Sequence, residues 1–81
     1  MNVCVRLFAR ARDLAGKDAI SLELPGGATA GELRRRLAAE LPMLHGLLER
    51  CALAVNDEFA DDALTLPIAA QVAVLPPVSG G

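Results

Sequence analysis

The sequence predicts an α+β domain in which a mixed β-sheet wraps around one main helix. Three observations lead to this fold class: short segments with alternating apolar residues, one longer segment with apolar residues every four positions, and a length of 81 residues. A chain of this length forms one domain, and folding buries about 60 to 65% of its surface. The core must be aliphatic, because 53% of the residues are hydrophobic but only Phe8 and Phe59 are aromatic.

The first 27 residues read as two strands joined by a short helix. Apolar residues occupy every second position over 2–8 and again over 20–24, which is the period of a strand with one buried face. Residues 9–14 are predicted to form a short helical turn that ends at Gly16, and the second strand stops at 25–27. One face of the first strand carries Val3, Val5 and Leu7, and the other carries Cys4, Arg6 and Phe8.

The main helix is predicted to begin at Thr29. Thr29 and Glu32 have the spacing of a capping box, in which the two side chains satisfy free amides of the first helical turn. Leucines then recur every four residues as one buried stripe, and Pro42 marks the end of the helix. The stripe consists of Leu33, Leu37 and Leu41. The run Arg34-Arg35-Arg36 is interpreted as a solvated helix face, with a docking patch for an acidic partner as the alternative.

The second half of the chain is predicted to hold a short helix over 44–50, a β-hairpin over 53–60 and a last strand over 71–75. The hairpin turn falls at Asn56-Asp57, because both residue types tolerate positive φ. Asp61-Asp62 ends the hairpin. Between the hairpin and the last strand, Leu64 and Leu66 are expected to pack against the core.

This order of elements is that of the β-grasp, or ubiquitin-like, fold. In such a layout the first and last strands lie at the centre of the sheet and pair in parallel, connected through the helix. This layout brings the C-terminus to an exposed edge of the domain. We therefore expect a single β-grasp domain over 1–81, with residues 76–81 as a projecting C-terminal tail.

The chain ends at Gly80-Gly81, and this ending points to chemistry at the C-terminal carboxylate. Glycine has no Cβ, so the last two residues can pass through a narrow channel into an enzyme. A carboxylate is a poor electrophile until a leaving group is attached, and adenylation by ATP supplies one. The acyl adenylate can then react with a sulfur donor to give a thiocarboxylate, or with a cysteine to give a thioester.

Pro76-Pro77 separates the last strand from the diglycine. Two prolines remove backbone donors and fix φ, so the strand must stop there and the chain beyond it should be stiff and extended. At about 3.3 Å per residue, residues 76–81 can reach at most about 20 Å. That reach is enough for the tail to enter a partner's active site while the domain docks outside.

Composition argues against several classes of function. The net charge of −2 does not suit nucleic-acid binding, which requires a cationic surface. The N-terminus lacks the pattern of a signal peptide and no apolar run reaches about 18 residues, so we expect a cytoplasmic protein that does not enter membranes. Cys4 and Cys51 are expected to be largely buried thiols at strand positions, outside any cationic setting.

These two cysteines and His45 cannot supply the four ligands of a zinc site, so no metal is expected. His45 is placed in a loop or at a helix end. The sequence also lacks a nucleophile, base and orienting group that could act together. We therefore expect no bound cofactor and no catalytic activity of the chain by itself.

The motifs together resemble the small subunit of molybdopterin synthase, a family of ubiquitin-like sulfur carriers in molybdenum cofactor synthesis. The resemblance runs along the whole chain. It is carried by Leu7-Phe8-Ala9 leading into 12–16, by 29–33, by Ala54-Val55-Asn56 and, most specifically, by Pro76-Pro77-Val78-Ser79-Gly80-Gly81.

The resemblance implies a function for the tail. An E1-like adenylyltransferase would use ATP to adenylate Gly81, and a sulfurtransferase donor would convert it to a thiocarboxylate. The tail would then enter the large catalytic subunit, with Gly80 giving clearance, and donate sulfur to cyclic pyranopterin monophosphate to form the molybdopterin dithiolene. The resemblance also implies a heterotetramer of two small and two large subunits.

The sequence departs from this family in two places that concern partner binding. An acidic Gly-Asp-Glu turn before the last strand is replaced by 67–71, and the aromatic residues before the prolines are replaced by Val74 and Leu75. An apolar patch of Phe8, Leu75 and Phe59 is the candidate docking surface, together with Pro76, Pro77, Val78 and Ser79 of the tail. The alternative is that Phe8 and Phe59 belong to the core.

Three kinds of function remain open at this point. The first is a sulfur carrier, for molybdopterin or for the related thiamine, cysteine or tRNA thiolation pathways. The second is a ubiquitin-like modifier that forms isopeptide bonds with other proteins. The third is a passive interaction module, which would not need Gly81.

Overall fold

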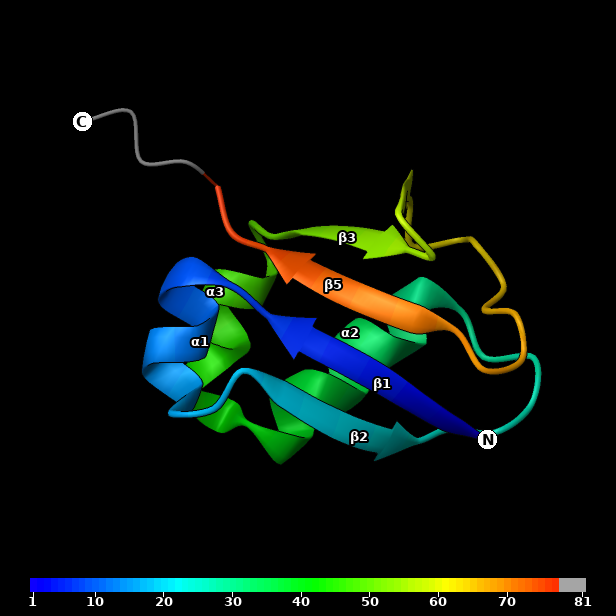
Figure 1. The fold of residues 1–81 in the computed structure, drawn as a ribbon, viewed down its shortest axis with the longest axis horizontal. Coiled ribbons are helices and arrows are strands. Elements are labelled where there is room, and N and C mark those ends of the chain that lie inside the picture. Colours follow the sequence, from blue (N-terminus) through cyan, green and yellow to red (C-terminus); the bar gives the residue numbers. More distant parts are fainter. Residues whose placement is uncertain (78–81) are drawn as a thin grey trace.

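Helices cover one face of a five-stranded sheet in the computed structural model, which describes residues 1–77 (Figure 1). The elements in chain order are β1 (Asn2–Leu7), α1 (Ala9–Ala15), β2 (Ala19–Glu23), α2 (Ala30–Glu40), the 3₁₀ helix η1 (Pro42–Leu44), α3 (His45–Leu48), β3 (Ala52–Val55), β4 (Glu58–Ala60) and β5 (Gln71–Leu75). This is the predicted α+β class, with a mixed sheet around one main helix.

The strand order is β2-β1-β5-β3-β4, so the first and last strands lie inside the sheet. β1 and β5 pair in parallel, with Val5 opposite Val72 and Leu7 opposite Val74. The other neighbours, β1 with β2, β3 with β5 and β3 with β4, are antiparallel. The β-grasp topology expected from the sequence is therefore confirmed.

The core lies between the sheet and α2. Val3, Val5 and Leu7 of β1 are at most 1% exposed, as are Val72 and Val74 of β5. The predicted leucine stripe of α2 packs against them, since Leu33 and Leu37 are fully buried and Leu41 is 7% exposed. Burial of each such side chain contributes about 1.5 to 3 kcal/mol. Alternation in the strands and the four-residue repeat in the helix thus meet in one core.

Local signals set the ends of the elements. At the start of α2, the Glu32 N–H donates to the Thr29 hydroxyl at 3.2 Å. The hydroxyl in turn lies 3.5 Å from the Glu32 carboxylate, so Glu32 reaches the side chain of Thr29 rather than its amide. α1 ends at Gly16, whose φ of 73° is left-handed and whose N–H donates to the Arg12 carbonyl.

The hairpin turn between β3 and β4 is the predicted one. Asn56 and Asp57 have φ values of 48° and 71°, the positive angles that a two-residue turn of type I′ needs. Asn56 also fastens the turn to β5. Its N–H donates to the Gln71 carbonyl at 2.8 Å, and its side-chain oxygen accepts from the Gln71 N–H at 2.9 Å.

Two burial predictions are wrong. Cys4 is exposed, because β1 turns its Val3, Val5 and Leu7 face to the helices and its Cys4 face to the uncovered side of the sheet. Leu64 is 42% exposed, whereas Leu66 is buried as expected. The backbone explains the placement of this segment, because the Leu64 carbonyl accepts from Ala30 and the Leu66 N–H donates to Ala28.

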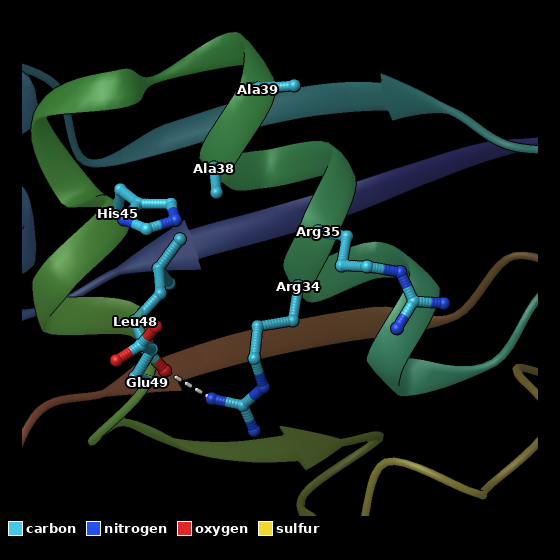
Figure 2. Close-up of a pocket in the computed structure, with 7 residues that line it drawn as sticks. All are labelled: Arg34, Arg35, Ala38, Ala39, His45, Leu48 and Glu49. Atoms are coloured by element: carbon cyan, nitrogen blue, oxygen red, sulfur yellow. Dashed lines mark hydrogen bonds between the residues drawn. The ribbon is translucent and has the colours of Figure 1, made fainter.

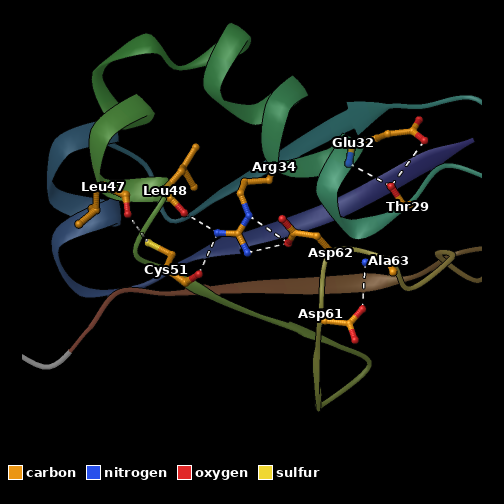
Figure 3. A network of polar contacts seen from close by, with 9 residues as sticks. All are labelled: Thr29, Glu32, Arg34, Leu47, Leu48, Cys51, Asp61, Asp62 and Ala63. Atoms are coloured by element: carbon orange, nitrogen blue, oxygen red, sulfur yellow. Dashed lines mark hydrogen bonds and ion pairs between the residues drawn. The ribbon is translucent and has the colours of Figure 1, made fainter.

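Arg34 corrects the interpretation of the arginine run as a solvated face. Its guanidinium donates to the carbonyls of Leu48 and Cys51, the latter at 2.8 Å, and to one carboxylate oxygen of Asp62 at 3.0 and 3.2 Å (Figure 3). The Arg34 side chain is only 19% exposed. It ties α2 to the end of α3, to the start of β3 and to the segment after β4. Arg35 and Arg36 do remain exposed.

Gly31 allows the segment after β4 to come close to α2. The Gly31 N–H donates to the Asp62 carbonyl at 3.0 Å, and a Cβ at this position would lie 3.0 Å from the Asp62 Cβ. A side chain would therefore push the segment away.

Over residues 1–77, none of the helices combines the length and the apolar character that crossing a membrane would need.

Candidate functional site

The tail leaves the sheet from β5. Leu75, the last residue of β5, pairs with Ala52 at the start of β3 and is half-buried, as is Pro76, whereas Pro77 is exposed. The strand therefore stops at the proline pair, as predicted. The predicted site residues Val78, Ser79, Gly80 and Gly81 lie outside the described residues.

One face of the sheet is left uncovered by helices, and we call it the open face. Figure 1 views the sheet from this side, with α2 behind the strands. The residues on this face alternate with the buried core residues of each strand. They are Asn2, Cys4, Arg6, Ala19, Ser21, Glu23, Ala52, Ala54, Phe59, Gln71, Ala73 and Leu75, with Phe8 just after β1. Most of them are small or uncharged.

The two phenylalanines belong to the surface, so the alternative of core residues is excluded. Phe8 is 38% exposed and Phe59 is 80% exposed. Phe8 and Leu75 each follow the last parallel pair, Leu7 with Val74, so both stand where the tail begins. Phe59 lies on β4 at the edge of the sheet, opposite Ala54. The predicted patch is therefore split, with alanines between its two parts.

A shallow hollow of about 150 Å³ lies on the open face between these parts. It is lined by Arg6 of β1 and Phe8 just after this strand, by Asp57 of the hairpin turn, and by Gln71 and Ala73 of β5. The guanidinium carbon of Arg6 is 5.9 Å from the centre of the Phe8 ring, within the range of a cation–π contact. From the sequence, Arg6 was expected on the face of the first strand opposite Val3, Val5 and Leu7, but it was not singled out as a site residue.

A larger groove lies on the other side of the molecule, between α2 and α3. Figure 2 shows that its lining comes from these helices and that the sheet lies behind them. Its volume is about 370 Å³, and the residues that line it include Arg35, Ala38, His45 and Glu49. His45 begins α3, in agreement with the predicted helix end. Size alone would favour this groove, but the tail begins beside the open face.

The cysteines lie on different sides of the sheet. Cys51 is buried just before β3 and its thiol donates to the Leu47 carbonyl at 3.2 Å (Figure 3). Burial raises the pKa of this thiol, and the nearby Arg34 and Arg50 oppose that shift only in part. The expectation that no cation lies near Cys51 is therefore wrong. Because the thiol stays protonated at neutral pH, it is a poor nucleophile.

A mixed sheet with two parallel inner strands and one main helix on one of its faces defines a ubiquitin-like, β-grasp domain. The chain belongs to the ThiS family, whose profile matches residues 5–81. A molybdopterin synthase sulfur carrier subunit from Arabidopsis thaliana is 33% identical over 81 residues, which cover 100% of this chain and 84% of that protein. The resemblance found in the sequence is thereby confirmed.

Solved structures agree with this assignment. SAMP1 from Haloferax volcanii superposes with a TM-score of 0.87 at 27% identity, and the match covers 100% of both chains. A chain in the complex of subunits 1 and 2 of the molybdopterin-converting factor from Helicobacter pylori superposes with a TM-score of 0.72 at 29% identity, again over 100% of both chains.

Proposed function

We propose that this chain is the sulfur carrier subunit of molybdopterin synthase and that Gly81 carries the sulfur. One observation supports this most directly: β5 ends directly at Pro76-Pro77, where the motif Pro76 to Gly81 begins in the sequence, and this strand end lies beside an open face that presents exposed apolar side chains. A partner that takes up the tail therefore also meets a surface on which the domain can dock.

The first step is activation of the C-terminal carboxylate. An E1-like enzyme adenylates Gly81 with ATP and releases pyrophosphate, which gives the carbonyl a good leaving group. The outer sulfur of a persulfide on the sulfurtransferase donor then displaces AMP to give an acyl disulfide. A second thiol reduces this bond, which releases the thiocarboxylate and leaves a disulfide. The chain itself holds no cofactor in this scheme, because ATP is bound by the activating enzyme.

The second step takes place in the large catalytic subunit. Phe8, Phe59, Leu75, Pro76 and Pro77 dock the domain, and Val78 and Ser79 continue into the partner. Gly80, which lacks a side chain, gives clearance for the thiocarboxylate of Gly81. Its sulfur adds to cyclic pyranopterin monophosphate, and water hydrolyses the resulting thioester and returns Gly81 to a carboxylate. A second thiocarboxylated carrier supplies the other sulfur of the dithiolene. The Helicobacter pylori complex of subunits 1 and 2 supports this pairing.

Intact mass spectrometry tests the carrier chemistry. Incubation with ATP, an E1-like activating enzyme and a sulfur source should add about 16 Da, the exchange of one oxygen for sulfur at an activated carboxyl. Deletion of Gly81 should abolish the gain. Gly46→Ala is the matched control, because a Cβ at Gly46 meets no atom within 4 Å and the variant should gain sulfur like the wild type.

The absence of a mass gain, with an activating enzyme that works on another carrier, would refute the proposal. A gain followed by no dithiolene, when the pterin precursor and a large subunit are added, would instead assign the chain to a related carrier for thiamine, cysteine or tRNA thiolation. If loss of Gly81 has no effect on function in cells, the chain is a passive interaction module.

A second candidate function is that of a protein modifier. It is favoured by the likeness to SAMP1, whose name stands for small archaeal modifier protein 1. This sequence offers a sharp test, because Lys17 is its only lysine and is exposed. If the chain conjugates to itself, Lys17→Arg should abolish the self-conjugates on a denaturing gel while conjugates with other proteins persist. A sulfur carrier that is not a modifier forms neither.

A further inference from the structure

The open face holds a cation that the fold does not use. Arg6 lies on β1, an inner strand of the sheet. Its neighbours across the strands are Ala19 on β2 and Ala73 on β5. Among the described residues of the open face it is the one cationic side chain. None of the ion pairs within residues 1–77 involves Arg6. Its charge is therefore available to a partner.

The hollow beside Arg6 is large enough to hold one side chain of a partner protein. The hollow beside it has a volume of about 150 Å³, and its floor includes Ala54 and Ala73. Pockets for small ligands and cofactors usually measure about 300 to 1,000 Å³, so this hollow is too small for such a ligand. Small alanine side chains let the surface of a partner protein come close to the sheet.

The Arg6 side chain is already positioned. Its guanidinium carbon lies 5.9 Å from the centre of the Phe8 ring, which holds the cation over the ring face. A guanidinium held in this way still has N–H donors in its own plane. Asp57 lines the hollow from the hairpin turn and would repel a carboxylate of a partner protein that came close to it. Such a carboxylate would therefore bind at the end of the hollow where Arg6 lies.

We infer that Arg6 is a specificity-determining residue, which binds a carboxylate side chain on the docking surface of the large subunit. The inference rests on the proposed function. In the proposed docking the large subunit covers the open face, and covering an arginine with apolar surface is unfavourable unless the charge is paired. A carboxylate can accept two parallel hydrogen bonds from the guanidinium, so it is the group that fits.

The test is the affinity of the large subunit from the same organism, measured by isothermal titration calorimetry. Arg6→Glu should weaken binding by about 30- to 1,000-fold, the usual effect of breaking a desolvated charge pair. Arg6→Lys should lose less, because it keeps the charge but not the bidentate geometry. Arg6→Gln should bind weakly and with a smaller dependence on salt. Thermal melts should show all three variants folded, since Arg6 is exposed.

Arg35→Glu is the matched control. Arg35 is also exposed and lies on α2, on the helical side, where the same change of charge should leave the affinity close to that of the wild type. If Arg6→Glu binds as tightly as the wild type, or if Arg35→Glu weakens binding equally, the inference about Arg6 is wrong. The proposed function as a sulfur carrier would still stand if the wild type gains sulfur. If the wild type gains no sulfur and does not bind the large subunit, the proposed function and this inference fail together.

Discussion

Arg34 and Arg6 show how differently the two sides of one sheet use the same side chain. On the helical side, Arg34 has partners from three segments of the chain and is largely buried. On the open face, Arg6 lies over the ring of Phe8 and takes part in none of the ion pairs within residues 1–77. The fold thus uses the charge of Arg34, whereas the charge of Arg6 is left without an ion pair among the described residues.

The same contrast holds for the apolar residues. Leu33 and Leu37 on the helical side are fully buried, whereas Phe59 on the open face is 80% exposed and gains little from folding. Substitutions on the helical side should therefore change stability with little effect on partner affinity. Substitutions on the open face should do the reverse, and the variants below break or sharpen this separation.

The largest effect is expected from Arg34→Ala. The change leaves the carbonyls of Leu48 and Cys51 without their side-chain donor and leaves Asp62 unpaired, which should lower the free energy of unfolding by about 2 to 3 kcal/mol. For a domain of this size the melting temperature should fall by about 10 °C or more. Urea denaturation and a thermal melt followed by circular dichroism measure both.

Arg36→Ala is the control for Arg34. Arg36 lies on the same helix and pairs with Glu40 at 3.3 Å, but both side chains are about half exposed. An exposed pair with this i,i+4 spacing contributes about 0.3 to 0.5 kcal/mol. Equal losses for the two variants would show that Arg34 does not link the segments as the structure indicates. Partner affinity of the folded fraction should be unchanged in both.

A smaller effect is expected from Cys51→Ala, by comparison with Cys4→Ala. Cys51 is buried and bonded to Leu47, so its loss should lower stability by about 1 kcal/mol, whereas the loss of exposed Cys4 should be within about 0.5 kcal/mol of neutral. Urea melts of the two variants measure the difference. Equal losses would contradict the placement of the two thiols on opposite sides.

The pH dependence of the stability gives a second test of the burial of Cys51. Because its pKa is raised in the folded state above the ordinary value of 9.0, the folded protein holds this proton more tightly than the unfolded chain. The resulting stability is complete at pH values below 9.0 and is lost as the pH rises through the folded-state pKa. Urea melts from pH 7 upward should show an alkaline decline that is smaller in Cys51→Ala.

The smallest effect, and one in the stabilising direction, is expected from Ala69→Gly. Ala69 has a φ of 61°, a left-handed conformation that disfavours a residue with a Cβ by about 1 to 2 kcal/mol. The greater entropy of glycine in the unfolded chain offsets about 0.5 to 1 kcal/mol of this, so a net gain of about 0.5 kcal/mol is expected. Ala63→Gly is the control and should destabilise, because Ala63 has no positive φ.

Most of the fold could be predicted from the sequence, because the signals that specify it are local. Alternation in β1 and the leucine repeat in α2 report which residues face the core, and the pair Asn56-Asp57 reports its own turn. The proline pair fixes the end of β5 in the same way. Each of these patterns depends on neighbours within one element, so no tertiary information was needed.

The sequence did not predict features that depend on distant segments. Nothing near Arg34 indicates that Asp62 and two carbonyls converge on it, because these partners lie 14 or more residues away. The exposure of Cys4 and Leu64 depends on which side of the sheet the helices cover and on how the segment after β4 crosses α2. The hollow beside Arg6 likewise forms only when β1, β5 and the hairpin turn come together.

Under the proposed function, the central position of β5 would link synthesis of the domain to its activation. Residues 1–70 contain β1 paired with β2, and β3 paired with β4, but the strand that joins these two pairs is the last to be translated. A polypeptide released early by the ribosome therefore lacks both a complete sheet and the diglycine. Under the proposed function, the activating enzyme meets Gly81 only on finished domains, so the fold itself acts as a check on the quality of the carrier before ATP is used.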